Sequence, residues 1–180
     1  MIKKIIFFLV VLLSFSMALA AEIDPIISEE VLFNIQTSKE IYYDLIEKDT
    51  ELIKEHMLDF IGQEEYKLLF LEKDRDGLYE SSLGLYEDNK DQHLITHFYY
   101  EDLNDSVFLR VHNKDKFGDT LERSTFWLSK ESNSWGDGLE LGETAFALRV
   151  VHPYEYNNEL IGYIEFGKEI EEYLLELMWI

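Results

Sequence analysis

The sequence predicts an α+β fold in which one long helix precedes an antiparallel β-sheet. Apolar residues recur at helical spacing over residues 27–60. Further along, two pairs of segments alternate apolar and polar residues, and a short turn separates the members of each pair (94–100 with 107–112, and 145–152 with 160–166). Helices that precede a run of hairpins are typical of an α+β domain with an antiparallel sheet.

The long helix has recognisable ends. Ser28 followed by Glu29 and Glu30 marks a start, because acidic side chains are favourable near the positive end of the helix dipole. Gly62 is a natural stop. A helix of about 30 residues is about 45 Å long at about 1.5 Å per residue, which exceeds the width of a small domain. We therefore expect part of it to project or to pair with a second copy in a homodimer.

Shorter elements connect the long helix to the sheet and the two hairpins to each other. Residues 64–90 predict shorter helices, with Asp74 and Asp76 as caps. Further along we expect a helix from Leu121 to Lys130, a turn at Gly136-Asp137-Gly138, and a final helix beginning near Lys168.

The first twenty residues have the pattern of an export signal. Lys3 and Lys4 precede an apolar run from Ile5 to Phe15, and Ala18-Leu19-Ala20 is a small-residue cleavage site. The alternative is an uncleaved signal anchor, but the 15 residues from 5 to 19 fall short of the ~20 that span a bilayer. Either way we expect the rest of the chain to be extracytoplasmic, in the periplasm or at the cell exterior.

We therefore divide the chain into four parts. They are a signal peptide or signal anchor at 1–20, the long N-terminal helix at 21–62, the main domain at 63–172 and the end of a C-terminal helix at 173–180. Only an uncleaved first part would contact a membrane.

Composition excludes several classes of partner. The chain has 37 Asp and Glu against 16 Lys and Arg, a formal net charge of −21, which repels nucleic acid and anionic lipid surfaces. An anionic small ligand is still allowed, because a nearby arginine outweighs a distant charge that salt screens. The absence of cysteine excludes disulfides, thiol catalysis and Cys-ligated metals.

Each predicted strand carries one apolar face and one polar face, because side chains alternate along a strand. In the strand at 107–112 we expect Phe108, Arg110 and His112 on one face, opposite Val107, Leu109 and Val111. The corresponding polar stripes of the other strands are His97 with Tyr99, Arg149 with Val151, and Glu165 with Tyr163. This pattern fits either a sheet face open to solvent or a ligand pocket covered by the excursion from Asp115 to Glu143.

If the face is a pocket, its residues suit a small polar ligand such as a carboxylate. Arg110 and Arg149 would form forked hydrogen bonds to that carboxylate. Neutral imidazole and phenol groups would supply further hydrogen bonds, and Trp127 or Trp135 would form an apolar wall. The candidate ligand-binding residues are Arg110, His112, Arg149, Tyr99, His97, Trp127 and Glu165.

The sequence carries no motif for catalysis, a metal or a cofactor. Glu72 to Gly77 imitates the start of a calcium-binding EF-hand loop, but Leu83 stands where the bidentate Glu is required. The histidines form no H-E-x-x-H zinc motif, and no nucleophile elbow, phosphate-binding glycine loop or dinucleotide fingerprint is present. We expect no cofactor and no catalytic residue, and a hydrolase has no positive support.

The segment FLRVHNKDKFGDTL, residues 108–121, resembles the F-L-R-x-H-x-P-x-x-F/Y-G-D-D-L signature of extracytoplasmic Cache sensor domains. Residues 138–167 are similar to that family's G-L-E-x-G … R-x-V-x-P-V … G-x-x-I-G-x-x-E-F-G block. The nearest type is the double-Cache "double sensory domain" of sensor kinases and chemoreceptors. The resemblance covers roughly residues 27–172. It implies a long N-terminal helix packed on a PAS-like antiparallel sheet, with the ligand between the sheet and its covering segments.

The family motifs place particular residues at matching positions, and the chain departs from them at others. Arg110, His112, Asp119, Arg149 and Glu165 match motif positions. Lys114 stands where the family usually has Pro, and Thr120 replaces the second Asp of G-D-D-L. No second Cache module and no kinase or methyl-accepting output region is present, so we expect either a stand-alone sensor-like protein or a fragment of a receptor.

Two functions follow from this resemblance. The first is an extracytoplasmic small-molecule sensing domain that feeds signal transduction, for example in chemotaxis. The alternative is a secreted accessory or interaction protein that keeps the Cache fold without a small-molecule ligand.

Overall fold

The computed structural model describes residues 29–142 and 145–170, and the chain divides into two compact units, Met1–Asp44 and Leu45–Ile180. Helix α2 (Glu29–Ile61) confirms the predicted long helix, which ends just before Gly62. The predicted export signal at 1–20 and the C-terminal helix end at 173–180 lie outside the described residues. Within the described ranges, no helix is both long and apolar enough to cross a membrane.

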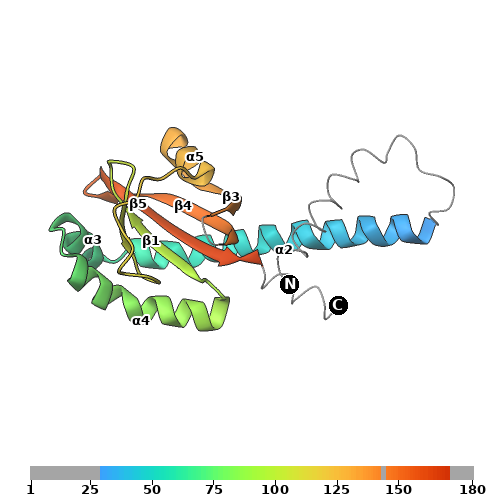
Figure 1. Cartoon of the computed structure of the whole chain (residues 1–180), viewed down its shortest axis with the longest axis horizontal. Helices are drawn as coiled ribbons and strands as arrows, with labels where there is room; N and C mark the ends of the chain where they lie inside the picture. The colour runs from blue at the N-terminus through green and yellow to red at the C-terminus, as the bar shows by residue number, and fades with distance from the viewer. Residues whose placement is uncertain (1–28, 143–144, 171–180) are drawn as a thin grey trace. The chain divides into compact units, whose positions relative to one another are not determined.

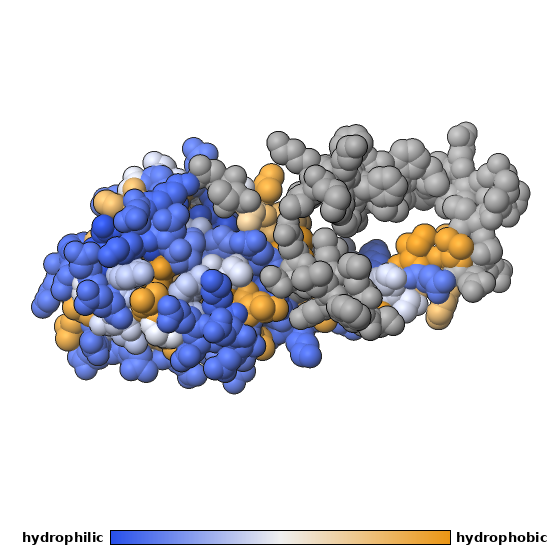
Figure 2. Space-filling model, turned by 60° about the horizontal axis from the view of Figure 1, so that its bottom comes forward, coloured by the Kyte–Doolittle hydropathy of each residue, from blue (hydrophilic) through white to orange (hydrophobic). Residues whose placement is uncertain are grey.

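The first unit is described from Glu29 onward and consists of the first half of α2. Gln36 Nε2 donates to Glu40 Oε1 at 2.7 Å, and the rings of Tyr42 and Tyr43 meet edge to face with centroids 5.8 Å apart. Phe33 and Ile35 are 70% and 55% exposed, and Figure 2 shows apolar surface on this part of the helix.

The second unit contains a five-stranded antiparallel sheet in the order β2-β1-β5-β4-β3 (Figure 1). The strands are β1 (His97–Glu101), β2 (Val107–Arg110), β3 (Gly136–Leu141), β4 (Phe146–Tyr156) and β5 (Glu159–Glu169). Both predicted hairpins are confirmed, as β1 with β2 and as β4 with β5. The N-terminal β1 lies beside the C-terminal β5 at the centre of the sheet, so the two hairpins form one surface.

The main hydrophobic core lies between one face of the sheet and three helices. These are the second half of α2, α3 (Glu64–Leu71) and α4 (Arg75–His93), and Asp74 caps α4 as predicted by accepting from the backbone N–H of Gly77 at 3.0 Å. Phe60 of α2 packs edge to face on Phe98 of β1, with ring centroids 4.7 Å apart. This core covers one face of the sheet and does not extend to the opposite face.

Helix α5 (Ser124–Ser132) covers part of the opposite face. Phe126 of α5 packs edge to face on Tyr163 of β5, with centroids 5.1 Å apart, in a second, smaller apolar cluster. The contact between α5 and β3 is so close that a Cβ on Gly136 would lie 2.2 Å from the carbonyl oxygen of Thr125. This close approach, rather than a turn, explains the glycine at position 136.

The structure corrects the sequence-based predictions at three places. Residues 136–138 belong to strand β3, not to a turn. A β-bulge in β2 puts Phe108 with the main core, where its ring meets Phe70 at 5.1 Å, and puts Val107 in the smaller cluster on the other face. Strand β1 begins at His97 because Leu94 is the left-handed cap of α4. The final helix predicted to begin near Lys168 begins at Ile170, directly after β5 ends at Glu169.

Candidate ligand pocket

The pocket-side face of the sheet is organised by strand register. Tyr99 of β1 lies opposite Arg110 of β2 on one side and Glu165 of β5 on the other. Arg149 of β4 and His97 of β1 lie opposite Gly167 of β5, one on each side. His97 and Arg149 crowd the space above Gly167, where an added Cβ would lie 3.2 Å from the Cβ of His97 and 3.7 Å from the Cγ of Arg149.

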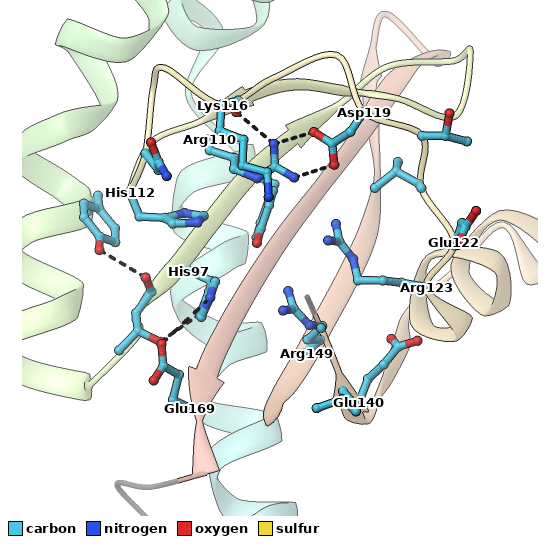
Figure 3. Close-up of a pocket in the computed structure, with 18 of the residues that line it drawn as sticks. His97, Arg110, His112, Lys116, Asp119, Glu122, Arg123, Glu140, Arg149 and Glu169 are labelled. Carbon is cyan, nitrogen blue, oxygen red and sulfur yellow. Dashed lines mark hydrogen bonds and ion pairs between the residues drawn. The ribbon is translucent and has the colours of Figure 1, made fainter. Parts of the chain in front are cut away.

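A cavity of about 870 Å³ lies over this face (Figure 3). Its walls come from β1, β2, β4, the ends of α4, β3 and β5, and the segment after β2. Five of the predicted residues line it: Arg110, His112, Arg149, Tyr99 and His97. The sheet face is therefore a hollow with polar walls, which corresponds to the second of the two interpretations left open by the sequence.

Arg110 is engaged by its own chain. Its Nη1 and Nη2 atoms each donate to one carboxylate oxygen of Asp119 at 2.6 Å, and Nη1 also donates to the carbonyl oxygen of Lys116 at 2.8 Å (Figure 3). The hydrogen bond from Arg110 lowers the pKa of the Asp119 carboxyl. Arg110 and Arg149 thus have different internal partners, Asp119 for the first and Glu165 for the second.

Arg149 and Arg123 meet at Glu165. Arg149 Nη1 donates to Glu165 Oε1, and Arg123 Nη2 lies 2.8 Å from Glu165 Oε2. Arg123 Nη2 also donates to Glu101 Oε1 at 2.6 Å. Arg149 is 2% exposed and Glu165 is fully buried, so Glu165 is not a wall residue but the buried counter-ion beneath the arginines.

The three guanidinium groups surround one aromatic ring. Their central carbons lie 5.2, 4.6 and 5.7 Å from the ring centroid of Tyr99, for Arg110, Arg123 and Arg149 respectively. The Nε atoms of Arg123 and Arg149 are buried and donate to no described residue. Buried donors without a partner are costly.

The two imidazoles of the pocket are held neutral. Burial, reinforced by the charge of its neighbour His112, lowers the pKa of His97 to about 3. Burial also lowers the pKa of His112 to about 4. Their rings lie 4.8 Å apart, and His97 Nδ1 is 2.9 Å from the hydroxyl of Thr96. Neutral imidazoles can each donate and accept one hydrogen bond without adding charge.

The two tryptophans do not form the expected apolar wall. Trp127 is 38% exposed on α5 with the Lys130 ammonium 4.9 Å from its ring, and Trp135 packs on His152 with centroids 4.0 Å apart. Neither lines the cavity, whose apolar contacts come instead from Leu121 and Leu141. The excursion lines the cavity only with residues near its two ends.

Sequence reasoning missed Arg123 and Glu101. Glu101 could have been found, because it follows Tyr99 by two residues on the same strand face. Arg123 precedes α5 at a position without periodicity, so no sequence signal identified it. Glu140 lines the pocket but caps α5, since its carboxylate accepts from the backbone N–H and hydroxyl of Thr125 at 3.3 and 2.8 Å. Among the described residues, no group of three or more His, Asp or Glu side chains is arranged to hold a metal ion.

Comparisons with known proteins show the fold. No family model and no curated protein matches the chain. The Escherichia coli DcuS sensor domain matches with a TM-score of 0.62 at 15% identity, over 73% of this chain and 96% of that one. The domain of a sensory box/GGDEF family protein from Vibrio parahaemolyticus matches with a TM-score of 0.56 at 17% identity, over 83% of this chain and 62% of that one.

A third match is the ligand-binding domain of the Campylobacter jejuni chemoreceptor Tlp3 in complex with 4-methylisoleucine, with a TM-score of 0.55 at 11% identity, over 83% of this chain and 64% of that one. The chain thus spans nearly all of the DcuS domain and less than two thirds of the other two. The long helix and PAS-like antiparallel sheet expected from the Cache resemblance are confirmed, and the fold is that of sensor and ligand-binding domains.

Proposed function

We propose that this chain is an extracytoplasmic sensing domain that binds a small anion, such as a carboxylate, in the pocket over β1, β4 and β5. The observation that carries this proposal is the distribution of arginine: the chain has four arginines, and three of them, Arg110, Arg123 and Arg149, line this one cavity. A concentration of buried guanidinium groups in a hollow is typical of sites that recognise carboxylates.

The net charge of the chain does not oppose this proposal. Charges that lie farther from the pocket than the Debye length, which is about 8 Å at physiological ionic strength, are largely screened by salt. Inside the pocket, Arg110 is matched by Asp119, whereas Arg123 and Arg149 share buried partners and keep unpaired Nε donors. An anion is therefore expected at the Arg123 and Arg149 side.

The rest of the pocket suits a ligand with further polar groups. His97, His112 and Tyr99 offer neutral hydrogen-bonding groups, and Glu169 offers a carboxylate whose Oε1 is 3.9 Å from His97 Nε2. Tlp3 is described in complexes with 4-methylisoleucine and L-norvaline, which are amino acids. We therefore include α-amino carboxylates beside simple carboxylates as candidate ligands.

We further propose that the domain acts outside the cytoplasm and transmits binding through α2, without catalysis. The neighbours include the periplasmic domain of Vibrio cholerae LuxQ and the sensor domain of the histidine kinase DctB. The exposed Phe33 and Ile35 in the first half of α2 support pairing with a second copy. In light scattering, wild type should have the mass of two chains and Phe33→Glu the mass of one chain. A wild type with the mass of one chain would contradict this part of the proposal.

The experiment that tests ligand binding is a thermal-shift screen of the full chain against small carboxylates and amino acids, followed by calorimetry. A true ligand at about 100 times its dissociation constant stabilises by about 2.7 kcal/mol. Arg149→Lys keeps the charge but removes the planar fork, and should weaken binding about tenfold or more. Arg75→Lys is the matched control, because Arg75 is the arginine that does not line the pocket.

Two results would contradict the proposal. Ligands that stabilise wild type and Arg149→Lys equally would bind elsewhere. A screen in which no compound stabilises wild type, together with capture of a protein partner, would favour the accessory role without a small-molecule ligand.

A further inference from the structure

Two buried carboxyl groups lie against each other beneath the pocket. Glu101 of β1 and Glu165 of β5 are both fully buried, and both contact the same atom: Arg123 Nη2 lies 2.6 Å from Glu101 Oε1 and 2.8 Å from Glu165 Oε2. One oxygen of each, Glu101 Oε2 and Glu165 Oε2, receives no hydrogen bond from any described residue. The 2.8 Å contact of Glu165 Oε2 with Arg123 Nη2 is an ion pair without hydrogen-bond geometry.

A proton on Glu101 would turn one of these unpaired acceptors into a hydrogen-bond donor toward its neighbour. Without it, two negative charges would stand side by side in a buried site, where carboxylate pairs retain a proton on one member. We propose that Glu101 and Glu165 share one proton, and that an anion in the pocket binds together with this proton. The second half of this proposal rests on the proposed anion-binding function.

The charges around the pair explain why binding of the anion and binding of the proton would be linked. Three guanidinium groups, those of Arg110, Arg123 and Arg149, face three carboxyl groups, those of Asp119, Glu101 and Glu165. If all three carboxyl groups are ionised the cluster is neutral, and if the pair holds its proton the cluster carries one positive charge. An anion therefore stabilises the protonated pair, and by reciprocity the proton strengthens anion binding.

The remaining groups near the pair do not change this balance. Burial, followed by the charge of Glu165, raises the pKa of Glu101 well above its ordinary value, which agrees with the geometry. His112 interacts with Glu165, and Tyr163 with Glu101, Asp105 and Lys130. Tyr99 and His97 interact with the arginines that contact the pair. Burial disfavours the charged forms of both imidazoles and of the Tyr163 phenol.

Carbon-13 NMR of the full chain labelled at the glutamate carboxyl carbons tests both halves. The Glu101 resonance is assigned by its loss in Glu101→Gln, and is titrated in sodium chloride and in sodium sulfate of equal ionic strength. Sulfate serves as the probe because it stays a dianion in this pH range. We expect Glu101 to be protonated at neutral pH, and its midpoint to rise by about one pH unit in sulfate, which corresponds to a tenfold linkage.

Two results would overturn the proposal. Ionisation of Glu101 near the ordinary glutamate value of about 4.3 in chloride would exclude the shared proton. A midpoint that is raised in chloride but does not move in sulfate would exclude the linkage.

Glu101→Gln provides a second measurement, because its amide imitates the protonated carboxyl. This variant should stay folded, and its thermal stabilisation by sulfate should no longer depend on pH. A pH dependence equal to that of wild type would exclude the pair as its source. If sulfate stabilises neither protein while Glu101 remains protonated, the linkage and the proposed anion site both fail, and only the shared proton stands.

Discussion

The hydroxyl groups of Ser82 and Tyr100 lie 2.7 Å apart in the interior of the protein, where α4 meets β1. Both residues are fully buried. The contact joins the helix layer to the strand that also carries His97, Tyr99 and Glu101, so it couples the core directly to the scaffold of the pocket.

Tyr100→Phe should lower the free energy of unfolding by about 1–2 kcal/mol, because it leaves the Ser82 hydroxyl buried without its partner. Tyr154→Phe is the matched control. Tyr154 is equally buried, but its hydroxyl has no hydrogen-bond partner among the described residues, so removing that oxygen should leave stability unchanged or raise it. Urea denaturation measures both variants, and an equal loss in both would contradict the role of the Ser82 bond.

The ion pair between Arg110 and Asp119 should hold the segment after β2 in place over the pocket. We expect Asp119→Asn to cost about 1 kcal/mol, a modest figure because the Asp119 side chain is 44% exposed and screened by solvent. The folded-state pKa of Asp119 is lowered, so its contribution is present above the unfolded pKa and is lost as pH falls through the folded value. Denaturation curves at pH 7 and pH 3 should therefore differ less for Asp119→Asn than for wild type.

The sequence predicted the long helix, both hairpins and five of the pocket-lining residues, because these depend on local periodicity. Strand β3 was missed because Gly136 and Gly138 are typical of turns, whereas here Gly136 is required by the tertiary contact with α5. The bulge at Phe108 depends on pairing with β1, which alternation within one strand cannot reveal. Arg123 reaches the pocket only through the fold, from a residue that precedes α5.

His97 should make the protein less stable in mild acid. Its folded-state pKa of about 3 is below the unfolded value of about 6.5, so the unfolded chain binds more protons between these values. Stability contributed by the neutral imidazole is therefore complete above pH 6.5 and falls as pH decreases, at up to about 1.4 kcal/mol per pH unit. The Glu101 carboxyl, whose pKa is raised, contributes with the opposite sign.

Because these two effects oppose each other, the His97 contribution is best measured by difference. The free energy of unfolding of wild type minus that of His97→Gln should shrink as pH falls from 6.5 to 5. Proton NMR of the imidazole Hε1 atom gives an independent check, since the His97 signal should not titrate between pH 8 and pH 5. A midpoint near 6.5 would show that the pocket does not exclude the charged form.

Gly136 and Gly84 should respond in opposite directions to the same substitution. A Cβ on Gly136 would lie 2.2 Å from the Thr125 carbonyl oxygen and 2.6 Å from the Ser129 backbone nitrogen, so α5 must move away from β3. Gly136→Ala should therefore cost about 2–3 kcal/mol, and it should weaken ligand binding because Arg123 precedes the displaced helix. Gly84, inside α4, has no atom within 4 Å of such a Cβ, and Gly84→Ala should stabilise by about 0.5–1 kcal/mol through the higher helix propensity of alanine. Urea denaturation measures the free energy of unfolding of both variants. A stable Gly136→Ala protein with unchanged ligand affinity would show that α5 does not position Arg123.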